Sequence, residues 1–199
     1  MSETLKYCNE RKLAVVPQSG RTSQVGGSVA LHDEIVLNMS LMDKILGFDT
    51  TYGIISAQGG AILKSLQDYS EERGYQLPCD FVARDKCMIG GSLANNAAGY
   101  KLMGEGSFHS NAVGMKAVLA DGTILDNMTT LRKDVSGYDV KHLFIGSKGT
   151  LGIITECSIL CKPAFKNRHV ALIAVSSLDQ VSEVINQAKL CMEDIIQSL

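Results

Sequence analysis

Glycine and other small residues are concentrated in three short segments, and these limit the possible folds more than any other feature. The segments are residues 17–28, 87–99 and 146–152. Because glycine has no side chain, it permits tight turns and lets backbone approach another backbone or a ligand closely. The chain has 19 glycines but only 3 prolines. This ratio predicts a folded domain with many tight turns, and not a flexible linker.

The composition is that of a soluble globular protein. Hydrophobic residues make up 45% of the 199 residues and charged residues 20%, which is enough apolar material for a core and excludes general disorder. The length predicts one domain or one and a half. The net charge of −2 gives no basic surface for nucleic acid. No apolar run reaches the roughly 18 residues of a membrane span.

The six cysteines and the N-terminal residues also limit the class of protein to which this chain can belong. No pair forms Cys-x-x-Cys, and no Cys/His group has the spacing of a zinc site. We expect buried free thiols in a reducing compartment. Residues 1–11 contain neither the apolar core of a signal peptide nor the Arg-rich pattern of a transit peptide. They predict a helix inside the fold.

Hydrophobic periodicity and turn signals predict an alternation of helices and strands. Leu5 and Cys8 share one face of the first helix, which Ser2 is suited to cap. Asp121-Gly122 is a strong hairpin signal. The predicted helices are 2–12, 61–73 and 177–199, with a helical turn at 40–44. The predicted strands are 13–16, 34–37, 45–48, 53–57, 151–161 and 170–175, with a hairpin over 113–125.

The composition changes after Pro163. A predicted strand at 170–175 is followed by a helix whose apolar residues share one face. A strand and one helix cannot form their own core. We therefore divide the chain into a domain over 1–163 and the beginning of a second domain over 164–199. The apolar residues of that helix are Leu178, Val181, Ile185, Ala188, Met192 and Ile195.

The segment 17–28 directly follows a predicted buried strand. Consecutive backbone N–H groups in such a turn can form an anion nest, to which hydroxyls add donors. That arrangement suits a pyrophosphate. An ordinary surface loop would have the same composition.

The segment 87–99 combines Gly90 and Gly91 with Ser92 and two asparagines. The glycines would let backbone touch a ligand, Ser92 is suited to cap a helical turn, and Asn95 and Asn96 supply amide hydrogen bonds. The alternative is a closely packed turn of small residues.

The remaining motifs do not match the common nucleotide-binding sites, and none of them indicates a catalytic residue. The segment 146–152 is not a Walker loop, because Lys148 is followed by Gly149, and no Gly-x-Gly-x-x-Gly motif exists. His109 lies between two turns without a nearby carboxylate, so a structural role is favoured over a catalytic one. The remaining histidines lack metal-ligand spacing. We assign no catalytic and no metal-binding residue.

Taken in order, several motifs resemble one family. The chain is similar to the FAD-binding domain of the vanillyl-alcohol-oxidase/PCMH flavoprotein superfamily, within the branch that contains D-2-hydroxyglutarate and D-lactate dehydrogenases. The resemblance covers about residues 5–175. The motifs that carry it are Val15–Gln18, Val25–Ser28, Gly90-Gly91 with Asn96, Gly106–Asn111, Leu119–Gly122, Leu131–Asp134, Gly137–Asp139 and Leu143–Gly146.

The resemblance implies an α+β fold in which two α/β subdomains enclose FAD, followed by the start of an α/β substrate domain. It implies hydride transfer from C2 of a D-2-hydroxy acid to flavin N5, an electron-acceptor protein, and mitochondrial localisation. Carried over by position, the cofactor-binding residues are Pro17, Gln18, Ser19, Gly20, Arg21, Thr22, Ser23, Gly26, Gly27, Pro78, Ile89, Gly90, Gly91, Ser92, Asn96, Gly152, Ile153 and Ile154.

The chain departs from the family pattern at several of these places. Ser19 and Ser23 replace glycines of the first loop, Arg21 replaces an asparagine, and Lys148 replaces a glutamate. The family's substrate-binding, metal-binding and catalytic residues come from the C-terminal domain. Two hypotheses therefore stand: the FAD-binding portion of a dehydrogenase, which alone is inactive, or a non-catalytic remnant that binds flavin.

Overall fold

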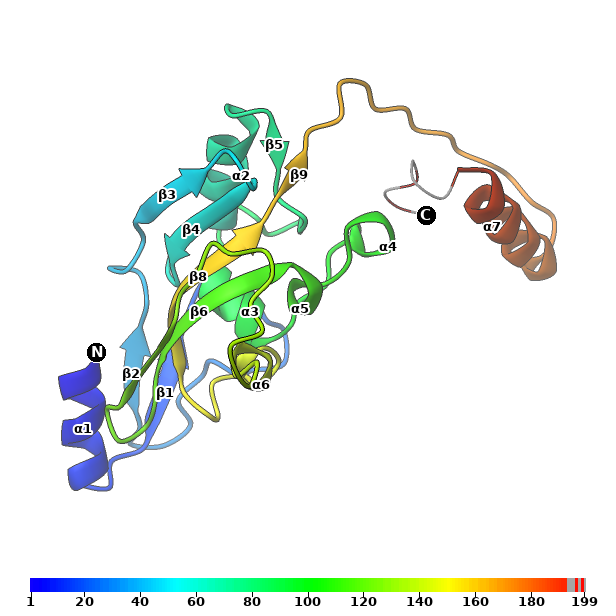
Figure 1. Cartoon of the computed structure of the whole chain (residues 1–199). Helices are drawn as coiled ribbons and strands as arrows, with labels where there is room; N and C mark the ends of the chain where they lie inside the picture. The colour runs from blue at the N-terminus through cyan, green and yellow to red at the C-terminus, as the bar shows by residue number, and fades with distance from the viewer. Residues whose placement is uncertain (193–195, 197, 199) are drawn as a thin grey trace.

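A five-stranded antiparallel sheet forms the centre of the fold (Figure 1). The computed structural model describes residues 1–192, 196 and 198. The strand order is β3-β4-β8-β6-β7, so the two strands from the first half of the chain pair with the three from the second half through β4 and β8. The strands are β3 (Ile45–Asp49), β4 (Ile54–Gln58), β6 (Ala112–Val118), β7 (Ile124–Asn127) and β8 (Ile153–Leu160).

A smaller unit at the N-terminus consists of α1 (Ser2–Glu10) and the parallel pair β1 (Val15–Gln18) and β2 (Ile35–Asn38). Leu5 and Cys8 of α1 are buried, as their spacing predicts. Leu5 packs with Met39 and with Val118 and Ile153 of the large sheet. The smaller unit is thereby attached where β6 ends and β8 begins, two inner strands of the central sheet.

Two predictions for this unit are wrong in detail. The strand begins at Val15, not at residue 13, because Leu13 lies in the turn after α1 and is 40% exposed. Ser2 does not cap α1. It is the first helical residue, and its hydroxyl donates a hydrogen bond of 2.5 Å to the carbonyl of Gly122.

The paired strands at 45–48 and 53–57 and the hairpin around Asp121-Gly122 are confirmed as β3–β4 and β6–β7. Residues 40–44, predicted as a helical turn, contain only a non-helical turn. Met42 N–H donates to Met39 O there, and no helical ladder follows. The predicted helix at 61–73 is the shorter α2 (Leu63–Glu71).

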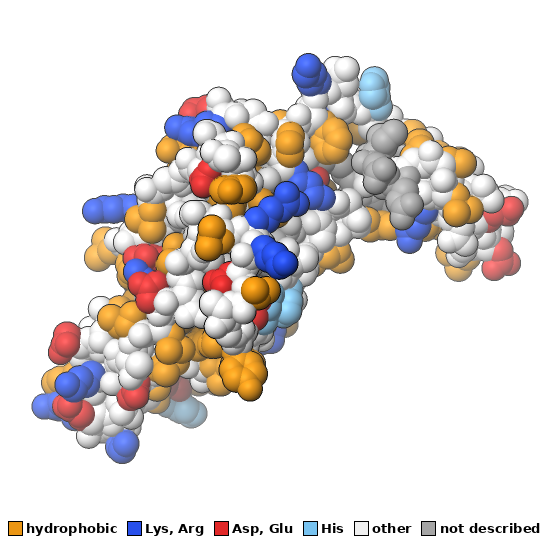
Figure 2. Space-filling view, viewed as in Figure 1, with side chains coloured by type: hydrophobic (Ala, Val, Ile, Leu, Met, Phe, Trp, Pro, Cys, Tyr) orange, Lys and Arg blue, Asp and Glu red, His pale blue; other side chains and the backbone are white. Residues whose placement is uncertain are grey.

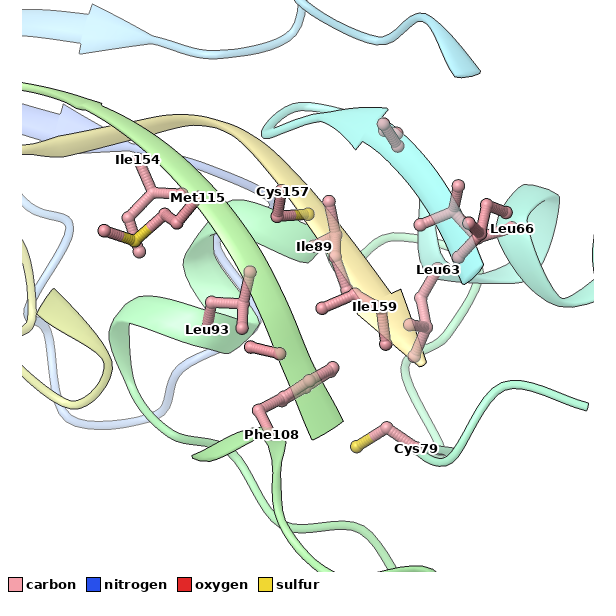
Figure 3. Packing of buried hydrophobic residues seen from close by; sticks show 14 of the residues in the cluster. Leu63, Leu66, Cys79, Ile89, Leu93, Phe108, Met115, Ile154, Cys157 and Ile159 are labelled. Atoms are coloured by element: carbon pink, nitrogen blue, oxygen red, sulfur yellow. The ribbon is translucent and has the colours of Figure 1, made fainter. Parts of the chain in front are cut away.

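The main core lies between the sheet and two helices, α2 and α3 (Ile89–Ala94). Ile89 and Leu93 of α3 point toward β6 and β8, where they meet Cys157 and Ile159 (Figure 3). Phe108 closes one end of this cluster. Burial of each such side chain contributes about 1.5–3 kcal/mol to folding. The remaining elements are β5 (Tyr75–Gln76), α4 (Leu102–Glu105), α5 (Phe108–Asn111), α6 (Lys141–Phe144) and β9 (Lys162–Pro163).

Five of the six cysteines are buried free thiols, as expected, whereas Cys191 is exposed. Burial raises the pKa of Cys157 to about 12 and that of Cys161 to about 11. These thiols remain neutral at physiological pH and act as small apolar core residues.

The region after Pro163 lies apart from the rest (Figure 1). The strand predicted at 170–175 is wrong: these residues are extended without a sheet partner, and Val170 and Leu172 are fully exposed. The helix predicted over 177–199 is confirmed only in part, as α7 (Leu178–Met192), because the described residues 196 and 198 are not helical. None of the described residues of α7 is buried. Its hydrophobic side chains lie at the surface (Figure 2). Ile195 is outside the described residues.

The two glycines that follow β4 make close backbone contacts. Gly59 N–H donates to Thr155 O at 2.7 Å, and Gly60 N–H donates to Met42 O at 2.8 Å. A Cβ on Gly60 would lie 2.0 Å from Met39 O. Since no real Cβ approaches a carbonyl oxygen so closely, position 60 requires glycine.

This contact predicts the effect of a methyl group. Gly60→Ala should lower the free energy of unfolding by about 3 kcal/mol, because backbone must move to relieve the overlap. Gly47→Ala, whose Cβ would have no atom within 4 Å, should change it by less than about 0.5 kcal/mol. Urea denaturation followed by circular dichroism measures both. Equal stability of the two variants would contradict the proposed packing at Gly60.

Candidate functional site

A cavity of about 460 Å³ lies where the three glycine-rich segments meet. One wall is the loop at residues 19–28, the second is α3 with the residues before it, and the third is formed by 148–154. The predicted cofactor residues that line it are Pro17, Ser19, Gly20, Arg21, Thr22, Ser23, Gly27, Gly90, Gly91, Ser92, Gly152, Ile153 and Ile154.

The first loop is held at both ends by Gln18. The Gln18 Nε2 donates to Ser28 O at 3.0 Å, and Oε1 accepts from Asn38 Nδ2 at 2.9 Å. A single side chain thus joins the end of β1, the end of β2 and the end of the loop. The backbone N–H groups of residues 20–24 donate to no other described residue. They are therefore available to a ligand.

The first loop packs directly on the second segment. A Cβ on Gly20 would lie 2.1 Å from Lys86 O, and one on Gly91 would lie 2.8 Å from Ser19 Cβ. Residues 19 and 20 therefore rest on the backbone that leads into α3. The alternative interpretation, an ordinary surface loop, does not require such close contact with the segment before α3.

The glycines of the second segment lie inside α3, where Gly90 N–H donates to Gly59 O at 2.8 Å. The prediction that Ser92 caps a helical turn is wrong. Ser92 is the fourth residue of α3, and its hydroxyl donates to Met88 O at 3.1 Å. The helix begins earlier because Ile89 and Leu93 both face the core.

The third segment joins the other two. Lys148 N–H donates to Ala94 O at 2.8 Å, which fixes it against the end of α3. A Cβ on Gly149 would lie 2.8 Å from Pro17 Cγ, so this segment also contacts the end of β1. Residues distant in sequence thus enclose one space.

The cavity carries positive but no negative side chains. Arg21 and Lys148 line it, and no Asp or Glu among the described residues does. Five hydroxyl groups add hydrogen-bonding capacity, from Ser19, Thr22, Ser23, Ser28 and Ser92. Cys87 also lines the cavity, and burial raises the pKa of its thiol, which stays uncharged. This donor set fits an anion.

Five of the predicted residues do not line the cavity. Gln18 holds the loop, as described, and Gly26 forms a turn with φ +74°. Pro78 and Ile89 are buried in the core, and Asn96 Oδ1 accepts a hydrogen bond from His109 N–H at 3.3 Å. These residues support the walls from outside.

Other lining residues were absent from the predicted set. Some belong to the same glycine-rich segments, and their place there was the available signal: Val25, Ser28, Cys87, Met88, Ala94, Asn95, Ala97, Lys148 and Gly149. Met39, Phe81 and Ala83 come from elsewhere and carry no distinctive pattern. They supply apolar surface.

His109 does not line the cavity. Its ring stacks on that of His142, with centroids 3.9 Å apart. His142 Nε2 lies 3.1 Å from Asp139 Oδ2, and burial lowers the pKa of His142 despite that carboxylate. The geometry agrees with the structural role favoured from the sequence.

Asp80 holds together two segments that flank the cavity. Its carboxylate accepts a hydrogen bond from Tyr100 and lies 3.3 Å from Arg84 Nη1. Burial alone would raise the pKa of Asp80, but the Tyr100 hydrogen bond and the charges of Lys101 and Arg84 outweigh it. The pKa of Asp80 therefore lies below its usual value.

Comparison with known proteins identifies the family. Residues 1–127 match the family described as FAD binding domain. The chain belongs to this family. FAD is accordingly its cofactor, as the resemblance implied.

The relatives and solved structures agree. D-2-hydroxyglutarate dehydrogenase of Danio rerio is 46% identical over all of this chain, which covers 37% of that protein. D-2-hydroxyglutarate–pyruvate transhydrogenase of Saccharomyces cerevisiae is 36% identical, with 40% of it covered. This chain thus spans little more than a third of their length.

A solved alkyldihydroxyacetonephosphate synthase shares the fold, with a TM-score of 0.73 and 24% identity over 83% of this chain and 30% of that one. The predicted α+β FAD-binding fold is confirmed. Within the described residues, no helix has the length and hydropathy of a membrane span. The same residues contain no cluster of His, Cys, Asp and Glu able to hold a metal.

The Asp80 contacts predict a pH-dependent loss of stability. A carboxyl whose pKa is lowered on folding contributes stability above its unfolded pKa, near 4, and loses it as pH falls through the folded value. Asp80→Asn should cost about 1–3 kcal/mol at pH 7, and the difference from the parent chain should shrink below about pH 4. Thermal unfolding across pH 3–7 measures it.

Asp85→Asn serves as the control, since Asp85 is exposed and makes no hydrogen bond with another described residue. A gap between Asp80→Asn and the parent chain that stays constant with pH would contradict the ionised state of Asp80.

Proposed function

We propose that this chain is the FAD-binding portion of a flavin-dependent D-2-hydroxyacid dehydrogenase, of the type that converts D-2-hydroxyglutarate to 2-oxoglutarate. The observation that carries the proposal is the cavity, which is lined by free backbone N–H groups and two cations, with no carboxylate among its described lining residues. The relatives named D-2-hydroxyglutarate dehydrogenase support the choice of substrate.

The residues present fit FAD. The loop at 19–28 would hold the pyrophosphate through its N–H groups and hydroxyls. Met39, Phe81, Met88, Ile153 and Ile154 offer apolar surface to the flat rings. When bound, FAD supplies a hydride acceptor, so that a D-2-hydroxy acid is oxidised to a 2-oxo acid. The chain's own residues bind the cofactor, orient it and limit its contact with water.

The proposed domain division places FAD binding in residues 1–163 and the start of a substrate domain in 164–199. The exposure of the region after Pro163 supports it. Val170, Leu172 and Leu178 are each at least 85% exposed. Large apolar side chains that lie close together in the sequence are normally covered by other parts of a protein or by a partner. We propose that the substrate domain covers them in the whole protein.

For the whole protein we also propose an electron-acceptor protein as partner and a mitochondrial location. The flavin must pass on the electrons that it receives, which requires an acceptor. The relatives from Danio rerio and Arabidopsis thaliana are named as mitochondrial proteins.

A second candidate function is a flavin-binding remnant without catalytic activity. One observation favours it: within the described residues, no His, Asp or Glu lines the cavity. A proton acceptor for the substrate hydroxyl would have to come from elsewhere.

The fit of the first loop can be tested with two alanines. Gly20→Ala should weaken FAD binding at least about tenfold, because the loop must leave its contact with Lys86 O to relieve the overlap. Gly47→Ala is the control, because a Cβ at this position would have no atom within 4 Å and Gly47 does not line the cavity. This control should bind FAD as the parent chain does.

Flavin fluorescence during titration with apoprotein measures both dissociation constants. If the purified parent chain neither contains FAD nor takes it up, the proposed function is wrong. If Gly20→Ala binds FAD normally, the loop is not part of the site.

The proposed activity makes a separate prediction about this chain alone. Dithionite should bleach the bound flavin under anaerobic conditions, whereas D-2-hydroxyglutarate should not, because none of the described residues that line the cavity is a candidate base. Absorbance near the flavin maximum records both. Bleaching by D-2-hydroxyglutarate would contradict the need for a further domain.

A further inference from the structure

Arg21 and Lys148 are the charged residues that line the cavity among the described part of the chain. They come from segments far apart in the sequence. Neither side chain makes a hydrogen bond or ion pair with another described residue. By contrast, Lys116 contacts Glu156 at 2.9 Å and Asp126 at 3.0 Å. Two cations without a partner among the described residues therefore line the same cavity.

Backbone contacts hold the chain in place at Arg21 and at Lys148. Arg21 has φ +54° and Lys148 has φ +55°, in the left-handed region that side chains other than Asn and Gly rarely adopt. The Gly20 contact with Lys86 O holds the first, and the hydrogen bond to Ala94 O holds the second. Contact of Gly149 with Pro17 brings Lys148 next to the base of the loop.

Two unpaired cations in a cavity without carboxylates raise the local positive potential. A guanidinium can form two parallel hydrogen bonds to a phosphate, and an ammonium acts as a point charge. The pyrophosphate of FAD has two negative charges. Two positive side chains balance these two charges, and the backbone N–H groups of residues 20–24 can donate hydrogen bonds to the phosphate oxygens.

Resting on the proposed function, we infer that Arg21 and Lys148 together hold the pyrophosphate of FAD as a cationic clamp. In this loop Ser19 and Ser23 stand where glycines would let the backbone approach a phosphate more closely. The clamp makes affinity for FAD depend on charge as well as on backbone hydrogen bonds. It also makes that affinity sensitive to salt.

The test compares neutral variants that keep the left-handed backbone. In Arg21→Asn and Lys148→Asn the charge is lost, while asparagine tolerates a positive φ. Each should raise the dissociation constant of FAD about three- to tenfold, and the double variant by more. Lys12→Asn is the matched control, because Lys12 has φ +55° and does not line this cavity. Its FAD affinity should equal that of the parent chain.

Salt dependence and ligand choice identify the group that is bound. Raising the salt concentration from about 50 to 500 mM should weaken FAD binding to the parent chain markedly, but that to the double variant only slightly. The dissociation constant of ADP, which has two phosphates and no flavin, should rise by the same factor in the double variant. Circular dichroism confirms that the variants are folded.

Three outcomes decide the inference. Unchanged FAD affinity in the double variant would overturn it, and so would an unaltered salt dependence. Weaker FAD binding with an unchanged dissociation constant for ADP would assign the cations to the flavin instead of the pyrophosphate. Failure of the parent chain to bind FAD would be a failure of the proposed function, and is thus distinguishable from all three.

Discussion

The contact between Gly59 and Gly90 determines how the rest of the structure is arranged. Gly90 N–H donates to Gly59 O at 2.8 Å, and a Cβ on Gly90 would lie 2.8 Å from the same oxygen. At this one place the end of β4, the beginning of α3 and, through Thr155, the strand β8 touch through backbone alone. The cavity wall begins directly on the other side of α3. Packing of the core and the position of the site are therefore set by the same atoms.

The sequence predicted the parts of the structure that depend on local patterns. Alternating apolar residues, the Asp121-Gly122 turn and the glycine pairs gave the central strands and the three segments of the cavity. The segment after Pro163 shows the limit of such patterns. Val170 and Leu172 have strand-like composition, but a strand needs a partner, and the described chain provides none.

The residues that line the cavity could be predicted from the sequence only where they belong to glycine-rich motifs. Gly20 and Gly91 stand in visible motifs, whereas Met39 and Phe81 reach the cavity through tertiary packing that no local spacing reveals. Ser92 shows a related limit. Its residue type favours a helix cap, but burial of Ile89 and Leu93 starts the helix earlier. The described residues that line the cavity include hydrogen-bond donors and cations but no acidic or histidine side chain, which supports the proposal that this chain binds the cofactor and that the substrate's proton acceptor comes from elsewhere.

The order of strands in the sheet has a consequence for how the chain folds. β4 lies between β3 and β8, and its pairing joins Ile54 to Leu160. During synthesis, the edge of β4 remains unpaired until nearly all of the FAD-binding unit has left the ribosome. Non-local pairing of this kind slows folding, since the entropy of closing a long loop is lost before the contacts form. The residues between these strands include most of the cavity wall, so the binding site can assemble only in the last step of folding.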